Sequence, residues 1–455
     1  MYIGDYLGRR ALYSPDALAI VDTGQTPELR LSYAQMDERA NRLANALAEL
    51  ASIGHGDRVA ILAQDGVEHL DLLFACGKLG AIHTALNWRL HWRELQQILA
   101  GVTPTVLLYD DTFRDGVAEL AQVETPLRHW IHLNGPGIAG SRHYADLLDA
   151  APATPRRCET LVEEDIAAIV FTGGTTGLPK GAQISHRQIA WNALNTMIHD
   201  LQRGDIYVNV FPLFHVGGLF VYTLPQVILG GVTVLLKRFD ADQVLRLIER
   251  ERATVFAAVP AMYQMLTQTA AWNEVDLGSL RFCTSGGAPL PVPLVEQYTA
   301  EKGIRFKQGF GMTEFGPGLF ALAPEDAIRK AGSIGRPNFY IDARVVDAGN
   351  RPLGPGEVGE LVLKGPSIAS GYFNNAAAWA DVIDVAGWFH TGDLARYDAE
   401  GYFYIVDRLK DMFISGGENV YPAEIEAALY RHPAVFQCAV VGVPIPSGAR
   451  SARPT

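Results

Sequence analysis

Short apolar runs alternate with helical patterns along most of the chain, and this alternation limits the folds that are open to it. Arg58–Leu62 predicts a buried strand, Val67–Leu79 a helix and Thr105–Tyr109 the next strand. The same alternation continues through Tyr207–Val210, Ala241–Arg252, Thr254–Ala258 and Leu280–Thr284. Strands joined by helices assemble into sheets with helices packed on their faces. The pattern therefore predicts an α/β fold.

One helix start is marked by side chains. Ser32 and Gln35 have the spacing of a capping box, in which each side chain bonds to the backbone N–H of the other residue. The apolar residues that follow lie on one helical stripe: Met36, Ala40, Leu43, Leu47 and Leu50. We therefore expect a helix to begin directly after Ser32.

The pattern changes after about Ser333. Ile341–Val346 and Glu360–Leu363 predict strands, and Tyr397–Val406, broken at Asp398–Gly401, predicts a hairpin. These strands indicate a smaller β-rich subdomain. A helix over Pro422–Arg431 and an apolar strand over Cys438–Val443 follow, and the last residues, 447–455, are expected to lack regular structure.

Composition excludes several classes of function. A chain of 455 residues is too long for one ordinary core, so two or more domains or subdomains are expected. The formal net charge of −12 argues against nucleic acid or an anionic membrane as the main partner. The cysteines lie far apart without metal-binding spacing, and the N-terminus has no apolar signal core, which favours a reducing, cytoplasmic compartment. Phe211–Leu236 is apolar but contains glycines and prolines, so buried sheet and helix explain it better than a membrane span. Peripheral contact with a membrane stays open.

The stretch Phe171–Gly181, FTGGTTGLPKG, follows the apolar run Ile166–Phe171. Its glycines let backbone N–H groups turn toward an anion, its threonine hydroxyls add donors, and Lys180 adds a cation that can pair with phosphate. This composition suits a nucleotide triphosphate, although the residues around Lys180 differ from the P-loop pattern GxxxxGK[ST]. The alternative is a surface turn, in which Gly and Thr are common. The ordered succession of these residues favours phosphate binding.

The core of an α/β fold is normally neither polar nor rich in glycine. Further stretches of the chain depart from this expectation: Ser285–Pro289, Gln308–Glu314, Thr391–Asp393, Asp407–Lys410 and Ser415–Glu418. Glu314 is a hard oxygen ligand that suits Mg²⁺ on a triphosphate. Asp393 stands in a tight turn, from which its carboxylate can accept hydrogen bonds from ribose. Each residue alone also has a simpler interpretation: Glu314 as a surface carboxylate, Asp393 as a turn former and Arg408 as part of a solvated ion pair. Their joint occurrence in this order favours a nucleotide site.

The stretches FTGGTTGLPKG, QGFGMTE, TGD and DRLKDMFISGGENVYPAEIE resemble the core motifs of the adenylate-forming acyl-CoA synthetases. This family includes fatty-acyl-CoA and feruloyl-CoA synthetases, 4-coumarate ligases and luciferases, and the resemblance runs from about Tyr2 to Pro444. It implies that a carboxylate and MgATP form acyl-AMP and pyrophosphate, and that the acyl group then passes to coenzyme A. Attack on the α-phosphate needs cations that neutralise the spreading charge more than it needs a general base.

The resemblance also implies roles for single residues. Lys180, Thr313, Glu314 and His215 would be catalytic, with Thr313 bonding phosphate, Glu314 binding Mg²⁺ and His215 beside the acyl pocket. A core histidine satisfied by a backbone carbonyl is the alternative for His215. The residues expected to bind nucleotide or coenzyme A are Thr172, Gly173, Gly174, Thr175, Thr176 and Gly177 on the phosphates, Gly287, Ala288, Pro289, Gly309, Phe310 and Gly311 around adenine, Asp393 and Arg408 on the ribose, Lys410 at the domain hinge, and Gly416 and Gly417 along the pantetheine tunnel.

The chain departs from the family pattern in two places. Gly173 stands where the family usually has Ser. No lysine follows Lys410, and the pattern ends after Pro444, whereas the family's C-terminal domain carries a later lysine that serves adenylation. We therefore expect an adenylate-forming N-terminal domain over residues 1–407, with stacked α/β sheet subdomains and the β-rich subdomain, and a small, truncated α+β C-terminal domain over residues 408–455. Adenylation is expected to be impaired.

The sequence is thus interpreted as an ATP-dependent acyl-CoA ligase. Phe211–Pro225 and Glu314–Leu322 should line the acyl pocket, and because both are largely apolar, a fatty or aryl acid is the expected substrate. Two alternatives stay open: an adenylating enzyme that loads a carrier protein, and a non-catalytic protein that binds nucleotide or acyl-adenylate. The missing late lysine favours the non-catalytic protein, and the phosphate and Mg²⁺ motifs disfavour it.

Overall fold

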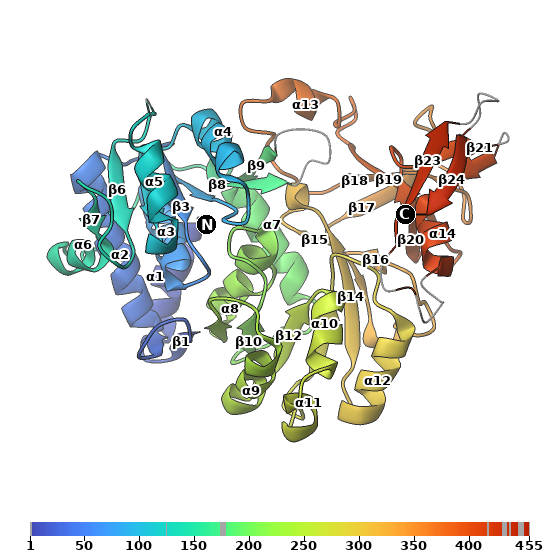
Figure 1. Ribbon diagram of the computed structural model, residues 1–455, viewed down its shortest axis with the longest axis horizontal. Helices are drawn as coiled ribbons and strands as arrows, with labels where there is room; N and C mark the ends of the chain where they lie inside the picture. The colour runs from blue at the N-terminus through green and yellow to red at the C-terminus, as the bar shows by residue number, and fades with distance from the viewer. Residues whose placement is uncertain are drawn as a thin grey trace.

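Two large sheets lie side by side in the computed structural model, and a β-rich part follows at one end of the long axis (Figure 1). The structure describes residues 2–123, 125–172, 179–415, 418–429, 435, 438–444 and 450–454. Within these ranges the strands form sheets of seven, nine, four, two and two strands. The fold class predicted from the alternation of strands and helices, α/β with a β-rich subdomain, is confirmed.

The seven-stranded sheet has the order β7-β6-β5-β3-β4-β8-β9. Its strands are β3 (Arg58–Leu62), β4 (Ile82–Ala85), β5 (Val106–Tyr109), β6 (His129–His132), β7 (Arg142–His143), β8 (Ile166–Thr172) and β9 (Lys180–Ser185). Its neighbours pair in parallel except β8 and β9, which run antiparallel and place Thr172 opposite Lys180. The helices of this part of the chain are α1 (Ile3–Tyr13), α2 (Tyr33–Ala51), α3 (Val67–Leu79), α4 (Trp92–Val102), α5 (Arg114–Leu120) and α6 (Tyr144–Ala150), with the 3-10 turn η1 (Asp111–Phe113).

The nine-stranded sheet has the order β16-β15-β14-β13-β12-β10-β11-β1-β2. Its strands are β1 (Leu18–Asp22), β2 (Leu29–Ser32), β10 (Ile206–Asn209), β11 (Val232–Leu235), β12 (Val255–Ala258), β13 (Phe282–Ser285), β14 (Phe306–Gly311), β15 (Gly318–Leu322) and β16 (Arg336–Pro337). The helices around it are α7 (His186–Met197), α8 (Thr223–Leu229), α9 (Ala241–Glu251), α10 (Pro260–Thr267), α11 (Ala271–Glu274) and α12 (Val292–Lys302), with short turns η2 (Gly217–Val221), η3 (Thr313–Phe315) and η4 (Pro324–Asp326). The parallel strands β1 and β10 to β14 all direct their carboxyl ends to one edge.

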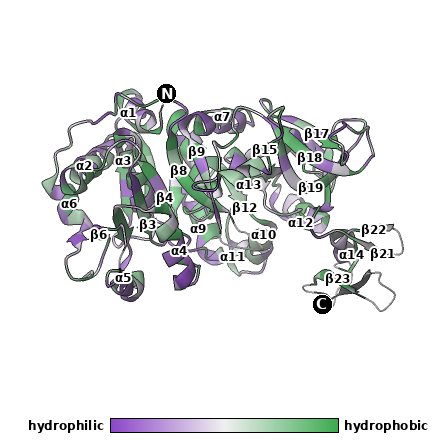
Figure 2. Cartoon of the chain, turned by 90° about the horizontal axis from the view of Figure 1, so that it is seen from above, coloured by the Kyte–Doolittle hydropathy of each residue, from purple (hydrophilic) through white to green (hydrophobic). Residues whose placement is uncertain are grey.

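The β-rich part is an antiparallel sheet of β17 (Asp342–Val346), β18 (Gly359–Lys364), β19 (Phe389–Tyr397) and β20 (Phe403–Arg408), with α13 (Ala376–Ala380) nearby. The predicted hairpin is the pair β19–β20. Beyond it lie β21 (Phe413–Ser415), β22 (Glu418–Val420), α14 (Pro422–Leu429), β23 (Val440–Pro444) and β24 (Arg450–Pro454), which Figure 2 shows at the end of the molecule.

Most predicted elements are confirmed to within two residues. Ser32 N–H donates to Gln35 Oε1 over 2.8 Å, and Gln35 N–H donates to Ser32 Oγ over 3.3 Å, so the capping box opens α2 as expected. The expectation of an end without regular structure is wrong, because β24 pairs antiparallel with β23. The backbone N–H and C=O groups along the edge of β23 can form hydrogen bonds with a polar segment. The hydropathy of the side chains in that segment does not indicate such pairing.

One apolar core joins the two large sheets. It combines Leu7 from α1 and Met36 from α2 with Ile184 from β9 and Phe220 from η2, all of them buried. Figure 2 shows the apolar strands inside and the polar outer faces of the helices. In the described part of the chain, no helix is both long and apolar enough to cross a membrane.

Helices α1 and α3 approach closely enough to require glycine. A Cβ atom built on Gly77 would lie 2.6 Å from the backbone nitrogen of Gly4 and would also overlap Ile3 Cγ2. Gly77→Ala should therefore destabilise the fold by about 1–3 kcal/mol, as overpacking of cores does.

The matched control is Gly101→Ala in α4, where nothing lies within 4 Å of the added Cβ. Alanine there should stabilise by roughly 0.5–1 kcal/mol, because glycine is the poorer helix former. Denaturant unfolding of both variants measures the difference, and equal effects would contradict the close contact.

Candidate functional site

The predicted nucleotide residues gather where β8, β9, β14, β19 and β20 meet. Gly309, Phe310 and Gly311 form the end of β14, and Thr313 and Glu314 lie in η3 directly after it. Asp393 lies in β19 opposite Arg408 in β20. Gly173–Gly177 lie outside the described residues, but Thr172 and Lys180 on either side of them are described.

The adenine-binding candidates come from two adjacent parallel strands. Ser285 at the end of β13 is in register with Gln308 of β14, so the exposed turn Gly287–Pro289 lies beside the end of β14. Gly287 has a φ of 80°, which glycine adopts without strain. The ring of Phe310 is half-buried and packs edge-to-face on Phe320 at 5.8 Å. The arrangement leaves a ring and exposed backbone side by side, as a flat heterocycle would need.

Glu314 is a buried carboxylate that other elements hold in place. Its side chain is 6% exposed, and its Oε1 accepts a 2.7 Å hydrogen bond from the hydroxyl of Tyr372. Its backbone oxygen accepts from the N–H of Ala369 over 2.7 Å. The neighbouring Thr313 is also buried, and its backbone oxygen accepts from Gln188 Nε2. A buried carboxylate in a fixed orientation suits a hard cation that shares its ligands with phosphate.

Lys180 is the exposed first residue of β9. Thr172 Oγ1 donates to the backbone oxygen of Lys180 over 3.3 Å, and the Lys180 ammonium lies 4.8 Å from the centre of the Tyr372 ring. Tyr372 therefore contacts both Lys180 and Glu314. Tyr372 was not among the residues predicted from the sequence, because an aromatic residue in a loop gives no signal of a partner so far away in sequence.

The predicted ribose residues form an ion pair. Arg408 Nε lies 2.6 Å from Asp393 Oδ1, and the exposed fractions of the two side chains are 56% and 3%. Asp393 Oδ2 is buried and has no hydrogen-bond partner among the described residues. Burial raises the pKa of Asp393 to about 6. The positive charge of Arg408 lowers this pKa, and the negative charges of Glu360 and Glu314 raise it. An unsatisfied buried acceptor fits a hydroxyl that a ligand would bring.

His215 follows the loop after β10 and has an exposed side chain. Its Nδ1 accepts a 3.0 Å hydrogen bond from the N–H of Gly217. The alternative of a core histidine is therefore wrong. Its place beside an acyl group stays a prediction.

The hinge and tunnel candidates are only partly described. Lys410 lies in the turn between β20 and β21, beside a recess that Phe413, Pro422 and Val440 also line. Gly416 and Gly417 lie outside the described residues. In the part of the chain that the structure describes, no three His, Cys, Asp or Glu side chains are grouped to hold a metal ion, so a metal at Glu314 would need ligands from a substrate.

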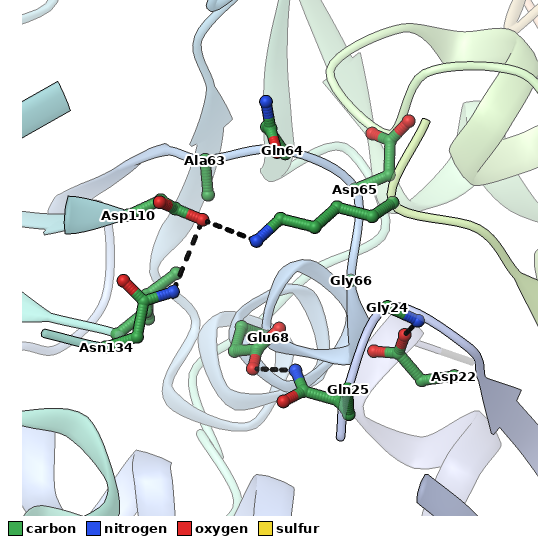
Figure 3. A pocket seen from close by; sticks show the side chains of 12 residues that line it. Asp22, Gly24, Gln25, Ala63, Gln64, Asp65, Gly66, Glu68, Asp110 and Asn134 are labelled. Carbon is green, nitrogen blue, oxygen red and sulfur yellow. Dashed lines mark hydrogen bonds and ion pairs between the residues drawn. The ribbon is translucent and has the colours of Figure 1, made fainter. Parts of the chain in front are cut away.

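A polar cavity of about 110 Å³ lies elsewhere, at the carboxyl ends of β1, β3 and β5 (Figure 3). Lys237 Nζ lies 3.4 Å from Asp110 Oδ2, and Gln25 Nε2 donates to Glu68 Oε1 over 3.0 Å. Burial raises the pKa of Glu68 to about 7. None of the predicted site residues lines this cavity, and its polar groups bond largely to one another.

The raised pKa of Asp393 gives a pH-dependent prediction. The folded protein favours the protonated carboxyl of Asp393, so ionisation of this group lowers the free energy of unfolding. The loss begins as the pH rises past the ordinary pKa of 3.8 and is complete above about pH 6. Asp393→Asn should therefore gain stability over the wild type as the pH rises through this window, by on the order of 2 kcal/mol, and then stay level.

Urea unfolding of both proteins across this pH range measures the gain. The exposed Asp342 on β17 supplies the control, since Asp342→Asn should show no such growth with pH. A constant difference between Asp393→Asn and the wild type at all pH values would contradict the raised pKa.

Known proteins are similar to this chain in sequence and in fold. A family model described as AMP-binding enzyme matches residues 7–373, and one described as AMP-binding enzyme C-terminal domain matches residues 424–451. A feruloyl-CoA synthase from an Amycolatopsis species is 40% identical over 98% of this chain and 86% of its own length. The long-chain-fatty-acid–CoA ligase FadD13 from Mycobacterium tuberculosis is 37% identical over 97% of this chain and 86% of its own.

Among solved structures, the o-succinylbenzoate CoA synthetase from Bacillus subtilis in complex with its acyl-adenylate intermediate superposes with a TM-score of 0.86. It is 31% identical, with 99% of this chain and 87% of that chain covered. These relatives are all acid–thiol ligases, so the predicted enzyme class is confirmed together with the resemblance. The chain belongs to the AMP-binding enzyme family.

Proposed function

We propose that the chain activates a fatty or aryl carboxylic acid as acyl-AMP, with release of pyrophosphate, and then forms acyl-CoA. The observation that carries the proposal is the grouping of Lys180, Glu314 and the Asp393–Arg408 pair from four separate strands and turns. Each supplies what one part of ATP requires: a cation for phosphate, a hard carboxylate and a hydroxyl acceptor.

In the first step a substrate carboxylate oxygen forms a bond to the α-phosphorus, and the bond to the bridging oxygen of pyrophosphate breaks. Lys180 neutralises charge on the phosphates, and Asp393 orients the ribose through its unpaired Oδ2. Mg²⁺, when bound at Glu314, would neutralise further charge on the triphosphate. In the second step the thiolate of coenzyme A attacks the acyl carbon, and AMP leaves.

The acid would lie between Phe211–Pro225 and Glu314–Leu322. Asn192 on α7 supports this placement, because its Nδ2 donates to Phe220 O over 2.9 Å and its Oδ1 accepts from Gly318 N over 2.9 Å. One side chain thus ties both expected walls together. Apolar residues dominate both walls, which favours an extended apolar or aromatic acid. The names of the feruloyl and long-chain-fatty-acid relatives support the same class.

The proposal includes a boundary between the N-terminal and C-terminal domains at residues 407 and 408, where β20, the last strand of the β-rich sheet, ends. It also includes a cytoplasmic location, which the buried thiols of Cys76 and Cys283 support because they suit a reducing compartment.

Carboxylate-dependent exchange of pyrophosphate into ATP tests the first step. Lys180→Ala should slow this exchange by about 2–4 kcal/mol in activation free energy, since a preorganised cation is lost from the phosphates. Lys302→Ala is the matched control: its ammonium also lies over an aromatic ring, that of Trp272 at 5.2 Å, but far from the site. Unchanged exchange in Lys180→Ala would sink the phosphate assignment, and a panel of acceptor thiols separates coenzyme A from a carrier protein.

A further inference from the structure

The short segment Ala369–Phe373 joins two parts of the candidate site. The N–H of Ala369 donates to the backbone oxygen of Glu314, and the N–H of Phe373 donates over 2.8 Å to the oxygen of Gly181, next to Lys180. Between them, Gln183 N–H donates to Gly371 O over 2.9 Å. The segment therefore holds the start of β9 and the turn η3 at a fixed separation.

Tyr372 is the central side chain of this segment. It is 6% exposed, belongs to the apolar core that joins the two sheets, and packs edge-to-face on Trp379 at 5.3 Å. Its hydroxyl donates to Glu314 Oε1, and its ring face carries the Lys180 ammonium.

Other buried tyrosines donate hydrogen bonds to partners of a different kind. Tyr33 and Tyr298 donate to backbone oxygens, of Gly231 and Tyr263 respectively. Tyr144 does donate to a carboxylate, Asp71 Oδ2 over 2.7 Å, but Arg39 already neutralises that carboxylate. In the described ranges no ion pair joins Glu314 to Lys180, although Tyr372 touches both. The phenol thus lies between an anion and a cation that would otherwise attract each other.

We propose that Tyr372 is a positioning residue that sets the Glu314 carboxylate and the Lys180 ammonium in the arrangement one metal–triphosphate needs. The hydroxyl fixes one oxygen of Glu314 and leaves the second oxygen for the metal. The ring keeps the ammonium over its face by cation–π attraction, so the cation stays available to phosphate. This inference rests on the proposed function, which assigns ATP to this site.

Two variants separate the two contacts. Tyr372→Phe keeps the ring and removes only the hydrogen bond, so half-saturating Mg²⁺ should rise about three- to tenfold, as the loss of one buried hydrogen bond allows. Tyr372→Leu also removes the ring, and at saturating Mg²⁺ it should bind ATP roughly two- to fivefold more weakly than Tyr372→Phe. Titration calorimetry of ATP at several Mg²⁺ concentrations measures both effects without turnover, and pyrophosphate exchange provides a second readout.

Tyr144→Phe is the control, because it removes a buried phenol–carboxylate bond far from the site. It should lose comparable thermal stability and keep the Mg²⁺ dependence of the wild type. A Mg²⁺ shift of equal size in Tyr144→Phe would overturn the proposal, as would a Tyr372→Phe protein that loses stability alone.

Glu314→Gln distinguishes this inference from the function on which it rests. If Glu314→Gln changes the Mg²⁺ dependence and Tyr372→Phe does not, Tyr372 has no positioning role and the proposed function stands. If neither variant changes it, or the wild type binds no MgATP, the metal assignment at Glu314 and the inference both fail.

Discussion

The apolar core shared by the two large sheets is the constraint on which the site depends. It holds α1, α2 and β9 against η2, and it reaches Tyr372 in the segment that leads from the β-rich part. Because cores pack densely, elements that share one cannot shift independently. The hydroxyl of Tyr33, which donates to Gly231 O over 2.6 Å, adds a polar link across the same contact. Packing therefore holds the start of β9, which carries Lys180, and backbone hydrogen bonds from Ala369 and Phe373 tie it to the turn η3 that carries Glu314.

The site concentrates opposite charges at short range in a chain of net charge −12. Asp393 and Glu314 are buried, whereas their cationic neighbours Arg408 and Lys180 are exposed. Burial disfavours the charged carboxyl of Asp393, which its pKa of about 6 expresses. At neutral pH the ionised Asp393 therefore lowers stability relative to a neutral residue at the same position. A ligand hydroxyl that donates to Asp393 Oδ2 would offset part of this loss.

Local patterns predicted much of the fold because they reflect forces between near neighbours. The capping box at Ser32 depends on two side chains one helical turn apart, and strands such as Arg58–Leu62 depend on a continuous apolar run. The end of the chain was predicted incorrectly for the same reason. Strand β24 exists through pairing with β23, and no residue within Arg450–Pro454 carries that information.

The sequence by itself determined the class of fold and the family, and it predicted the nucleotide-binding motifs, since each motif is a short ordered set of residues with its own chemistry. Only the tertiary structure decided how the motifs combine. The pairing of Asp393 with Arg408 follows from the register of β19 and β20, and the link from Lys180 through Tyr372 to Glu314 joins residues from three distant segments. The physical reason is that hydrogen bonds and cation–π contacts act over a few ångströms in space, and only chain folding brings residues far apart in sequence within that range.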